Sequence, residues 1–221
     1  NKFASLASVA LRPLPWISIG AGIQLLANMS GNVDIELSLI NEQSDGRSSE
    51  LALPIKPGGV VGITIRPFEE LTIGASWRQA LDLEIRLPTR LHIDEAFSLN
   101  LETRGTVLYT PEIYNLGVAY RVSHLRTLIS AEASFVRWSQ APDPSLRMKL
   151  EITGTIPDGL GLGDRLNIPD GSPVDPNFRD TLVLRIAAEH TLKSQWDLRG
   201  GYAWRPTPAP IPTGPYNYID G

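Results

Sequence analysis

The sequence predicts an all-β protein and, within that class, an antiparallel up-and-down transmembrane β-barrel. Three observations lead to this prediction: apolar and polar residues alternate along most of the chain, the alternating stretches are long, and the connections between them are short at one end and long at the other. No apolar run approaches the roughly 18 residues that a membrane-spanning helix needs, which excludes a helical membrane protein.

The alternation is clearest between Ile17 and Leu39. Every odd position in this stretch is apolar or glycine, and every even position except Leu26 is polar or glycine. Successive residues of a strand point to opposite faces, whereas a helix would mix the two sets. Soluble strands usually run about 3–10 residues, while an outer-membrane strand needs about 9–11 residues to cross the bilayer and can continue beyond it. The length therefore favours a membrane barrel over a soluble β-sandwich, which could also turn a charged face to water.

The turns between the alternating stretches divide the chain into about eight strands. They are expected at Phe3–Arg12, Trp16–Ile40, Glu50–Arg66, Leu71–Leu87, Phe97–Val122, Leu125–Ile156, Phe178–Leu192 and Trp196–Arg205. Pro111 and the pair Pro142 and Pro144 lie inside the two longest strands. They predict bends or bulges there, because proline cannot donate a backbone hydrogen bond to a neighbouring strand.

The connections differ in length at the two ends of these strands. Short turns are expected at residues 12–15, 67–70, 123–124 and 193–195, and long loops near 41–49, 88–96, 157–177 and 206–221. Outer-membrane barrels have short turns on the periplasmic side and long loops outside the cell. We therefore expect a single barrel domain over residues 1–221, with its long loops extracellular.

Aromatic residues gather near both ends of the predicted strands. One group lies beside the short turns, and a second group lies further along the same strands: Trp16, Phe68, Tyr120 and Trp196, then Trp77, Phe135, Trp138 and Trp204. Aromatic rings are common at the two interfaces of a bilayer, because they tolerate a mixed polar and apolar environment. The pattern predicts two aromatic girdles, with ordinary core packing as the alternative.

Composition excludes several classes of function. The chain carries a formal charge of −4 with a sequence pI near 5.4, whereas a nucleic-acid binder needs a dense basic face. It has no cysteine, so disulfides, Cys-ligated zinc and thiol catalysis are excluded. The glycine-rich run at 159–163 precedes no helical pattern, and its neighbouring aspartates match no calcium motif. We therefore expect neither an enzyme nor a protein with a metal or cofactor.

Charged residues on the predicted inward positions are the candidate functional set. They are Arg78, Arg86, Glu102, Arg104, Glu132, Arg185 and Arg199. Inside a barrel such side chains can bind an anionic head group or line a pore. The alternative is that they pair with one another across strands and stabilise a filled lumen.

Several segments resemble FadL-type (TodX-type) outer-membrane transporters in their order and spacing. They are Leu11–Gly22, Gly59–Arg78, the run from Pro111 to Tyr120 leading to Phe135–Ser139, and Asp197–Pro208, whose Leu-Arg-Gly-Gly-Tyr strand runs into a proline-rich stretch. The resemblance implies a fourteen-stranded barrel with an N-terminal hatch. Neither the hatch nor the final strands are recognisable here. We therefore expect the chain to be a fragment, with its eight strands in the middle of a larger barrel.

The same resemblance implies a function and a location. The family lies in the outer membrane of Gram-negative bacteria and takes up hydrophobic small molecules, such as long-chain fatty acids or aromatic hydrocarbons, by binding in the lumen and lateral release. The implied surroundings are membrane lipid and lipopolysaccharide, with no nucleic-acid partner, and we expect a monomer.

The resemblance also implies a ligand-binding role for some of the inward arginines and for one aromatic residue. A lumen arginine would meet a carboxylate while apolar side chains hold the tail, and the candidates are Arg78, Arg104, Arg199, Arg86, Arg185 and Trp138. Two alternatives remain, a general diffusion porin for small polar solutes and a structural or adhesive barrel. Leu26, Val60, Leu108, Val136 and Val183 interrupt the polar face and favour hydrophobic cargo.

Overall fold

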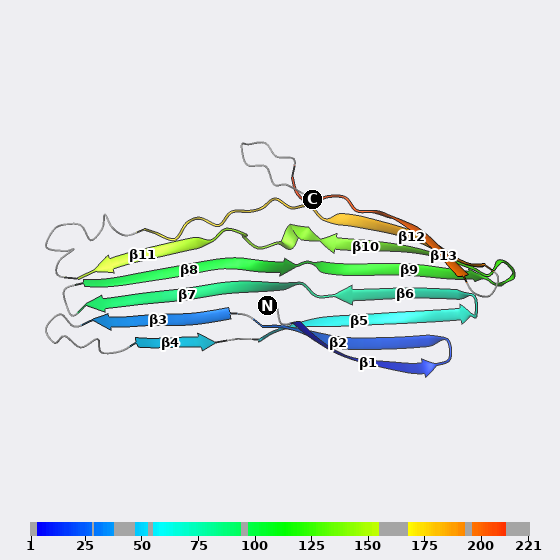
Figure 1. The fold of residues 1–221 in the computed structure, drawn as a ribbon, viewed down its shortest axis with the longest axis horizontal. Coiled ribbons are helices and arrows are strands. Elements are labelled where there is room, and N and C mark those ends of the chain that lie inside the picture. Colours follow the sequence, from blue (N-terminus) through cyan, green and yellow to red (C-terminus); the bar gives the residue numbers. More distant parts are fainter. Residues whose placement is uncertain are drawn as a thin grey trace.

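The computed structural model describes residues 4–27, 29–37, 47–52, 55–93, 97–154, 168–192 and 196–210. Two β-sheets lie end to end in this part of the chain (Figure 1). No helix in it has the length and apolar composition needed to cross a membrane.

The larger sheet has eight strands in the order β1-β2-β5-β6-β9-β10-β12-β13. Their bounds are Ala4–Leu14 (β1), Ile17–Ala27 (β2), Ile55–Phe68 (β5), Leu71–Arg78 (β6), Glu112–Val122 (β9), Thr127–Arg137 (β10), Thr181–Leu192 (β12) and Trp196–Trp204 (β13). Every neighbouring pair is antiparallel. This meander confirms the predicted up-and-down wall of a β-barrel, and β1 and β13 form the two edges of the sheet.

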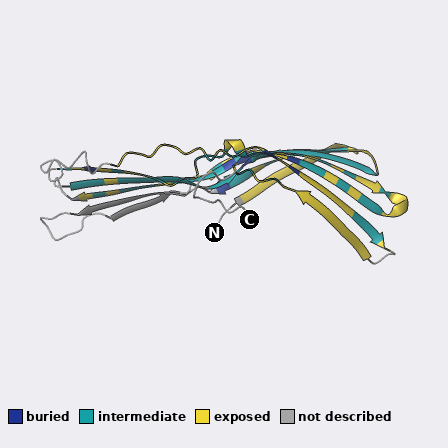
Figure 2. Ribbon diagram, turned by 90° about the horizontal axis from the view of Figure 1, so that it is seen from above, coloured by how far each residue is buried: buried dark blue, intermediate teal, exposed yellow. Residues whose placement is uncertain are grey.

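The two faces of the eight-stranded sheet differ in chemistry, as the alternation predicted. We call the apolar face the outer face; it carries large exposed side chains such as Ile23, Leu116, Ile186 and Leu198. The other, inner face carries mostly small or polar residues, which are generally less exposed (Figure 2). Lower exposure is expected on the concave side of a curved sheet, so the polar face is the lumen side.

Exposed aromatic side chains mark both ends of the outer face. Beside the turns lie Tyr120 and Trp196 on this face, with Trp16 and Phe68 at the rim of the sheet, and at the other end lie Tyr114, Phe135 and Trp204. Trp77, Tyr114 and Phe135 are aligned by the strand register. Tyr114 and Tyr120 are six residues apart, or about 20 Å at the usual rise per residue. The exposure of these rings supports two girdles and argues against core packing.

The smaller sheet has five strands in the order β11-β8-β7-β3-β4. Their bounds are Met29–Leu37 (β3), Arg47–Ala52 (β4), Leu81–Ile93 (β7), Phe97–Thr110 (β8) and Arg147–Thr153 (β11). Most of its strands continue the long paths predicted from the sequence. The paths are interrupted between the two sheets, at Pro111 as predicted, but also between β6 and β7 and between β2 and β3, where the alternation gave no warning.

One pairing departs from the predicted antiparallel meander. β3 lies between β4 and β7 and pairs with β7 in parallel, from Met29 opposite Ile85 to Leu37 opposite Ile93. In a simple meander β4 would hold that place. The order of β3 and β4 is therefore exchanged relative to a simple meander (Figure 1).

Strands occupy the described parts of the long loops predicted at 88–96 and 41–49, whose residues 94–96 and 41–46 lie outside the described residues. β7 runs to Ile93 and pairs with β8 as far as Phe97, because the alternation of apolar and polar residues continues past Pro88. Pro88 is tolerated because the parallel pairing with β3 skips its position, from Arg86 to Thr89. β4 likewise begins at Arg47, inside the predicted 41–49 loop.

The other two predicted loops are described only in part. Residues 168–177 run without a regular strand, apart from a bridge between Ile168 and Leu150. Residues 206–210 also lack regular structure. Residues 155–167 and 211–221 lie outside the described residues.

Short 3-10 turns flank β10: the first lies at the short turn predicted at 123–124, and the second interrupts the long strand predicted from Leu125 to Ile156. One covers Ser123–Leu125 (η1) and leads into Arg126, whose φ of 50° is left-handed. The other, Trp138–Gln140 (η2), follows β10 and precedes the prolines at 142 and 144. The predicted bend at these prolines is thus an irregular segment between β10 and β11, and it turns Trp138 away from the outer girdle.

Candidate ligand groove

A groove lies on the inner face where the eight-stranded sheet meets the five-stranded sheet. Its volume is about 560 Å³. The strand register aligns Val60, Arg78, Ile113, Val136 and Thr181 in one row across five strands, and this row forms the floor. The floor is therefore built by strands that are far apart in the sequence.

Three aromatic rings close one side of the groove region. Trp138 packs edge to face against both Tyr109 and Phe178, with ring centroids 6.1 Å apart in each pair. Trp138 and Tyr109 line the groove. The break at Pro111 and the turn η2 bring these rings together, because both interrupt strands that would otherwise carry them apart.

Two of the guanidiniums that line the groove lack a counter-charge. The Nε atom of Arg78 is buried without a hydrogen-bond partner among the described residues. Arg205 also lines the groove, and no hydrogen bond or ion pair engages its guanidinium within the same residues. An unpaired buried cationic group is costly, so the Arg78 Nε favours an anionic ligand, and the exposed guanidinium of Arg205 adds a second positive charge at the same groove.

Arg185, the third guanidinium, is already neutralised. It pairs with Glu132 and donates to the Ser134 hydroxyl at 3.0 Å. Ser134, only 3% exposed, donates in turn to Glu132 at 2.9 Å. Arg185 therefore lines the groove with its charge balanced.

Apolar side chains complete the lining. Val60, Val136 and Val183 interrupt the polar inner face, and all three lie in the groove. Val136 and Val183 are buried. The groove combines a cationic point with apolar and aromatic walls, which suits a molecule that has an anionic head and a hydrophobic body.

Comparison with known proteins identifies the architecture. The toluene transporter TodX of Pseudomonas putida superposes with a TM-score of 0.54 and 16% identity, over 94% of this chain and 56% of TodX. A FadL homologue of Pseudomonas aeruginosa gives 0.54 and 13%, over 94% and 50%. A TodX deletion mutant, described as a monoaromatic hydrocarbon channel, gives 0.54 and 15%, over 91% and 54%.

The chain has the FadL-type fold. It spans about half the length of the structures that it matches. Neither the protein-family comparison nor the comparison with curated proteins finds a match. At these identities the likeness concerns the fold.

Within the FadL-type fold, the three other predicted arginines lie outside the groove and have carboxylate partners. Arg199, 69% exposed, donates to Glu189 at 2.7 Å near the turns. Arg86 pairs with Glu84 at 3.1 Å in the five-stranded sheet. Arg104 holds Glu102 with two hydrogen bonds of 2.7 and 2.6 Å. Only the Arg199 pair joins two strands, as the pairing alternative to ligand binding predicted, whereas Arg86 and Arg104 pair within their own strands.

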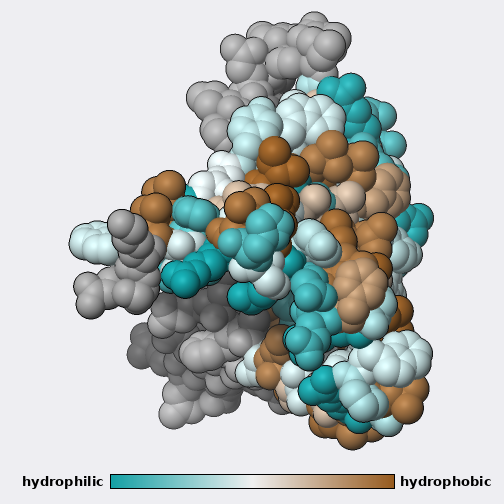
Figure 3. All heavy atoms as spheres, turned by 90° about the vertical axis from the view of Figure 1, so that its right-hand side faces the viewer, coloured by the Kyte–Doolittle hydropathy of each residue, from teal (hydrophilic) through white to brown (hydrophobic). Residues whose placement is uncertain are grey.

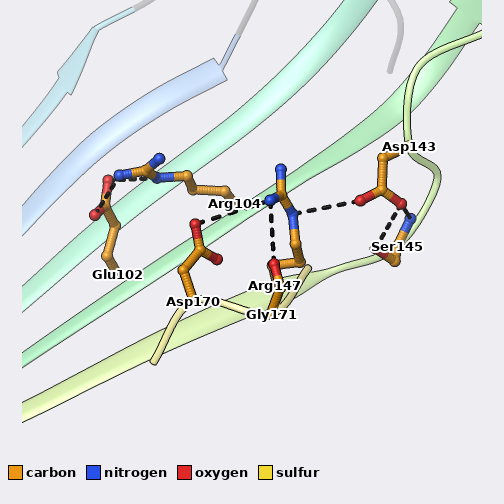
Figure 4. A network of polar contacts seen from close by, with 7 residues as sticks. All are labelled: Glu102, Arg104, Asp143, Ser145, Arg147, Asp170 and Gly171. Carbon is orange, nitrogen blue, oxygen red and sulfur yellow. Dashed lines mark hydrogen bonds and ion pairs between the residues drawn. The ribbon is translucent and has the colours of Figure 1, made fainter. Parts of the chain in front are cut away.

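The Arg104 pair belongs to a larger polar network in the five-stranded sheet (Figure 4). Arg147 lies opposite Arg104 in the register and contacts Asp143 at 3.4 Å and Asp170 at 3.8 Å. The hydrogen bonds from Arg104 hold the pKa of the Glu102 carboxyl below its usual value, and they raise the pKa of the Arg104 guanidinium. The network ties the segment after residue 168 to the sheet.

The structure adds groove residues to the predicted set. Arg205 shares the inner face with Arg199, so the alternation of β13 already placed it there. The sequence pattern did not indicate that Tyr109 and Phe178 would come together. Their contacts with Trp138 depend on the turn at Trp138 and on the path of the chain just before β12.

Proposed function

We propose that the protein is an outer-membrane channel that takes up hydrophobic small molecules, and that the groove binds the anionic head of an amphipathic cargo. The observation that carries this proposal is the unpaired Nε of Arg78 beside apolar and aromatic side chains. The channels of the same fold are described as toluene or monoaromatic hydrocarbon transporters, which supports transport of apolar compounds rather than catalysis.

The outer face supports the membrane location. Exposed apolar side chains cover it between two aromatic rows, and the spacing of about 20 Å along a strand fits the apolar band of an outer-membrane barrel, which is about 25 Å tall. Outer-leaflet lipid and lipopolysaccharide are the expected surroundings of a monomeric channel. Lateral release of the cargo would use the junction between the sheets, where the strands are interrupted.

Flux into proteoliposomes tests the proposal with the full-length protein. A labelled long-chain fatty acid should cross, and a small sugar should not. Arg78→Gln should lower fatty-acid flux about tenfold, because a hydrogen bond to a charged group contributes about 1.5–3 kcal/mol. Flux of a neutral aromatic hydrocarbon should not change. Arg90→Gln, an exposed arginine outside the groove, is the matched control.

Three outcomes contradict the proposal or part of it. Sugar flux comparable to fatty-acid flux would identify a general diffusion porin, for which the small and polar inner face would provide the path. Absence of both fluxes would favour a structural or adhesive barrel. Equal loss of fatty-acid and hydrocarbon flux in Arg78→Gln would remove the groove's role in recognising charge.

A further inference from the structure

A second cationic groove lies at the opposite, turn end of the inner face. Arg12, Arg66 and Arg121 come from three different strands, β1, β5 and β9, and line a groove of about 550 Å³ together with Trp16 and Phe68. Figure 3 views the molecule from this end and shows polar and apolar side chains side by side at the rim. The groove near Arg78 shares none of these residues.

Bulges place two of the three arginines. Arg12 and Arg66 each precede a proline, and the strand register shifts at both places, between Leu11 and Leu14 and between Ile65 and Phe68. A bulge re-aims the side chains of the residues inside it. The repeated Arg-Pro pair thus has one structural role at two neighbouring turns.

Backbone hydrogen bonds between turns hold the arginines in place. The amide of Arg66 donates to the carbonyl of Trp16 at 2.7 Å, and the amide of Arg121 donates to the carbonyl of Glu70 at 2.8 Å. Each bond joins an arginine of the groove to the neighbouring turn. The three arginines are therefore fixed relative to one another by the backbone.

The guanidiniums remain available to a ligand. Arg12 donates from Nε and Nη2 to the carbonyl of Pro15, a neutral acceptor. In the described ranges no hydrogen bond or ion pair engages the guanidinium of Arg66 or Arg121. Glu69 and Glu70 share the rim but form no ion pair with these arginines within those ranges. Three cations thus share one groove without a direct counter-charge.

We propose that Arg12, Arg66 and Arg121 form an oxyanion-binding site that takes a carboxylate or a phosphate. Guanidinium groups match the planar oxygens of both anions and bind them with paired hydrogen bonds, and clustered cations on a concave surface raise the local concentration of anions. Trp16 and Phe68 would contact an apolar group attached to the anion. This site does not depend on the proposed transport function.

Equilibrium binding to the full-length protein in a nonionic detergent tests the site. A variant keeps Trp16 and replaces the other four tryptophans of the five in the chain by phenylalanine. Quenching of Trp16 fluorescence by 4-bromobenzoate is compared with quenching by 4-bromobenzyl alcohol, which lacks the charge. The acid should quench at a concentration at least tenfold lower than the alcohol, and added salt should reduce that difference.

Charge variants connect the quenching to the arginines. Arg66→Gln with Arg121→Gln should raise the acid concentration for half-quenching at least tenfold and leave the alcohol unchanged. Arg66→Lys with Arg121→Lys should fall between, since lysine keeps the charge but loses the paired geometry. Arg126→Gln removes an exposed charge of the adjacent turn that does not line the groove, and it should change neither value.

Competition with inorganic phosphate identifies the source of the anion. Displacement of the acid by phosphate at a similar concentration assigns the site to free oxyanions. Displacement only at much higher concentration assigns it to carboxylates that carry an apolar group. The proposal is overturned if acid and alcohol quench alike, or if the glutamine pair folds, as judged by its circular dichroism, and binds the acid as well as the parent does.

Discussion

The glycines of the inner face serve two different purposes. A Cβ built on Gly22 would lie 2.7 Å from the carbonyl oxygen of Ala7, and one on Gly201 would lie 2.9 Å from that of Ile186. At Gly74 and Gly117 the closest atoms would be 3.9 and 3.7 Å away. The first two glycines allow close approach of neighbouring strands. The other two leave the lumen free of side chains, although the neighbouring strands would leave room for a Cβ.

Alanine substitutions should separate these two purposes. Gly22→Ala forces the backbone of β1 and β2 apart and should cost about 1–3 kcal/mol, as overpacking usually does. Gly117→Ala should change the free energy of unfolding by less than about 0.5 kcal/mol. Urea unfolding in lipid vesicles measures both values. Equal costs would show that the inner face tolerates no Cβ at either kind of position.

Acid should loosen the segment between β10 and β11 through Asp143. The Ser145 hydroxyl and amide donate to its Oδ1 at 2.6 and 2.9 Å, and they lower the pKa of Asp143 below its ordinary value of 3.8. A carboxyl with a lowered folded pKa stabilises the fold above its ordinary pKa, and this contribution disappears as the pH falls through the folded pKa.

Hydrogen exchange across this segment measures the effect. Protection should be constant near neutral pH and decline below about pH 4. Asp143→Asn should lower the protection at neutral pH and remove the part of the decline that belongs to Asp143. Parallel pH profiles for the parent and the variant would show that Ser145 does not stabilise the charged carboxylate.

Only part of the candidate site was predictable at the residue scale. The period-two pattern placed Arg78 and Arg185 on the inner face, because side-chain direction in a strand depends on local sequence alone. It could not tell that Arg185 has Glu132 as a partner while the Nε of Arg78 has none. Partner choice depends on the register between strands, and the register is set by turns and bulges.

At the scale of the strand, the chemistry of the two faces is the main determinant of stability in a membrane. Val118 lies on the outer face of β9 between the rows of Tyr114 and Tyr120, and its neighbour Ala119 points inward. Val118→Arg should cost about 2–4 kcal/mol, because it sets a charge into the hydrocarbon region. Ala119→Arg should cost far less, since its side chain reaches the lumen.

Unfolding in vesicles by urea gives both values for this matched pair of neighbours. Reversed costs would mean that the polar face contacts lipid, and the assignment of inner and outer face would be wrong.

The alternation predicted where the strands lie and which face each residue takes. Most of the breaks within the long strands could not be predicted from it. Pro111 predicted the break between β8 and β9, because proline lacks the backbone N–H donor that a central strand needs. No such residue separates β6 from β7, where the apolar positions Trp77, Leu81 and Leu83 keep the same parity. The change from one sheet to the other at this point depends on tertiary contacts, which the local sequence does not reveal.

At the scale of the whole molecule, the two sheets have different roles. The eight-stranded sheet provides the apolar outer band, the groove at the turn end and most of the groove near Arg78. The five-stranded sheet extends beyond it (Figure 1) and is held by ion pairs such as Lys56 with Asp82, which joins β5 to β7. The paired arginines of the five-stranded sheet therefore have a structural role in that sheet, whereas Arg78 and Arg205 line the groove for the proposed cargo.

The exchanged order of β3 and β4 affects how the molecule assembles. Four of the seven pairs in the eight-stranded sheet join strands that follow one another in the chain. Of these, β1–β2 and β5–β6 are closed by short turns and can form as soon as the second strand is present. β3 instead pairs with β7, and Met29 meets Ile85 only after the intervening strands have been laid down. Closing this long loop costs chain entropy before any contact compensates for it. The β3–β7 pair should therefore become native after the hairpins β1–β2 and β5–β6, whose strands are joined by short turns.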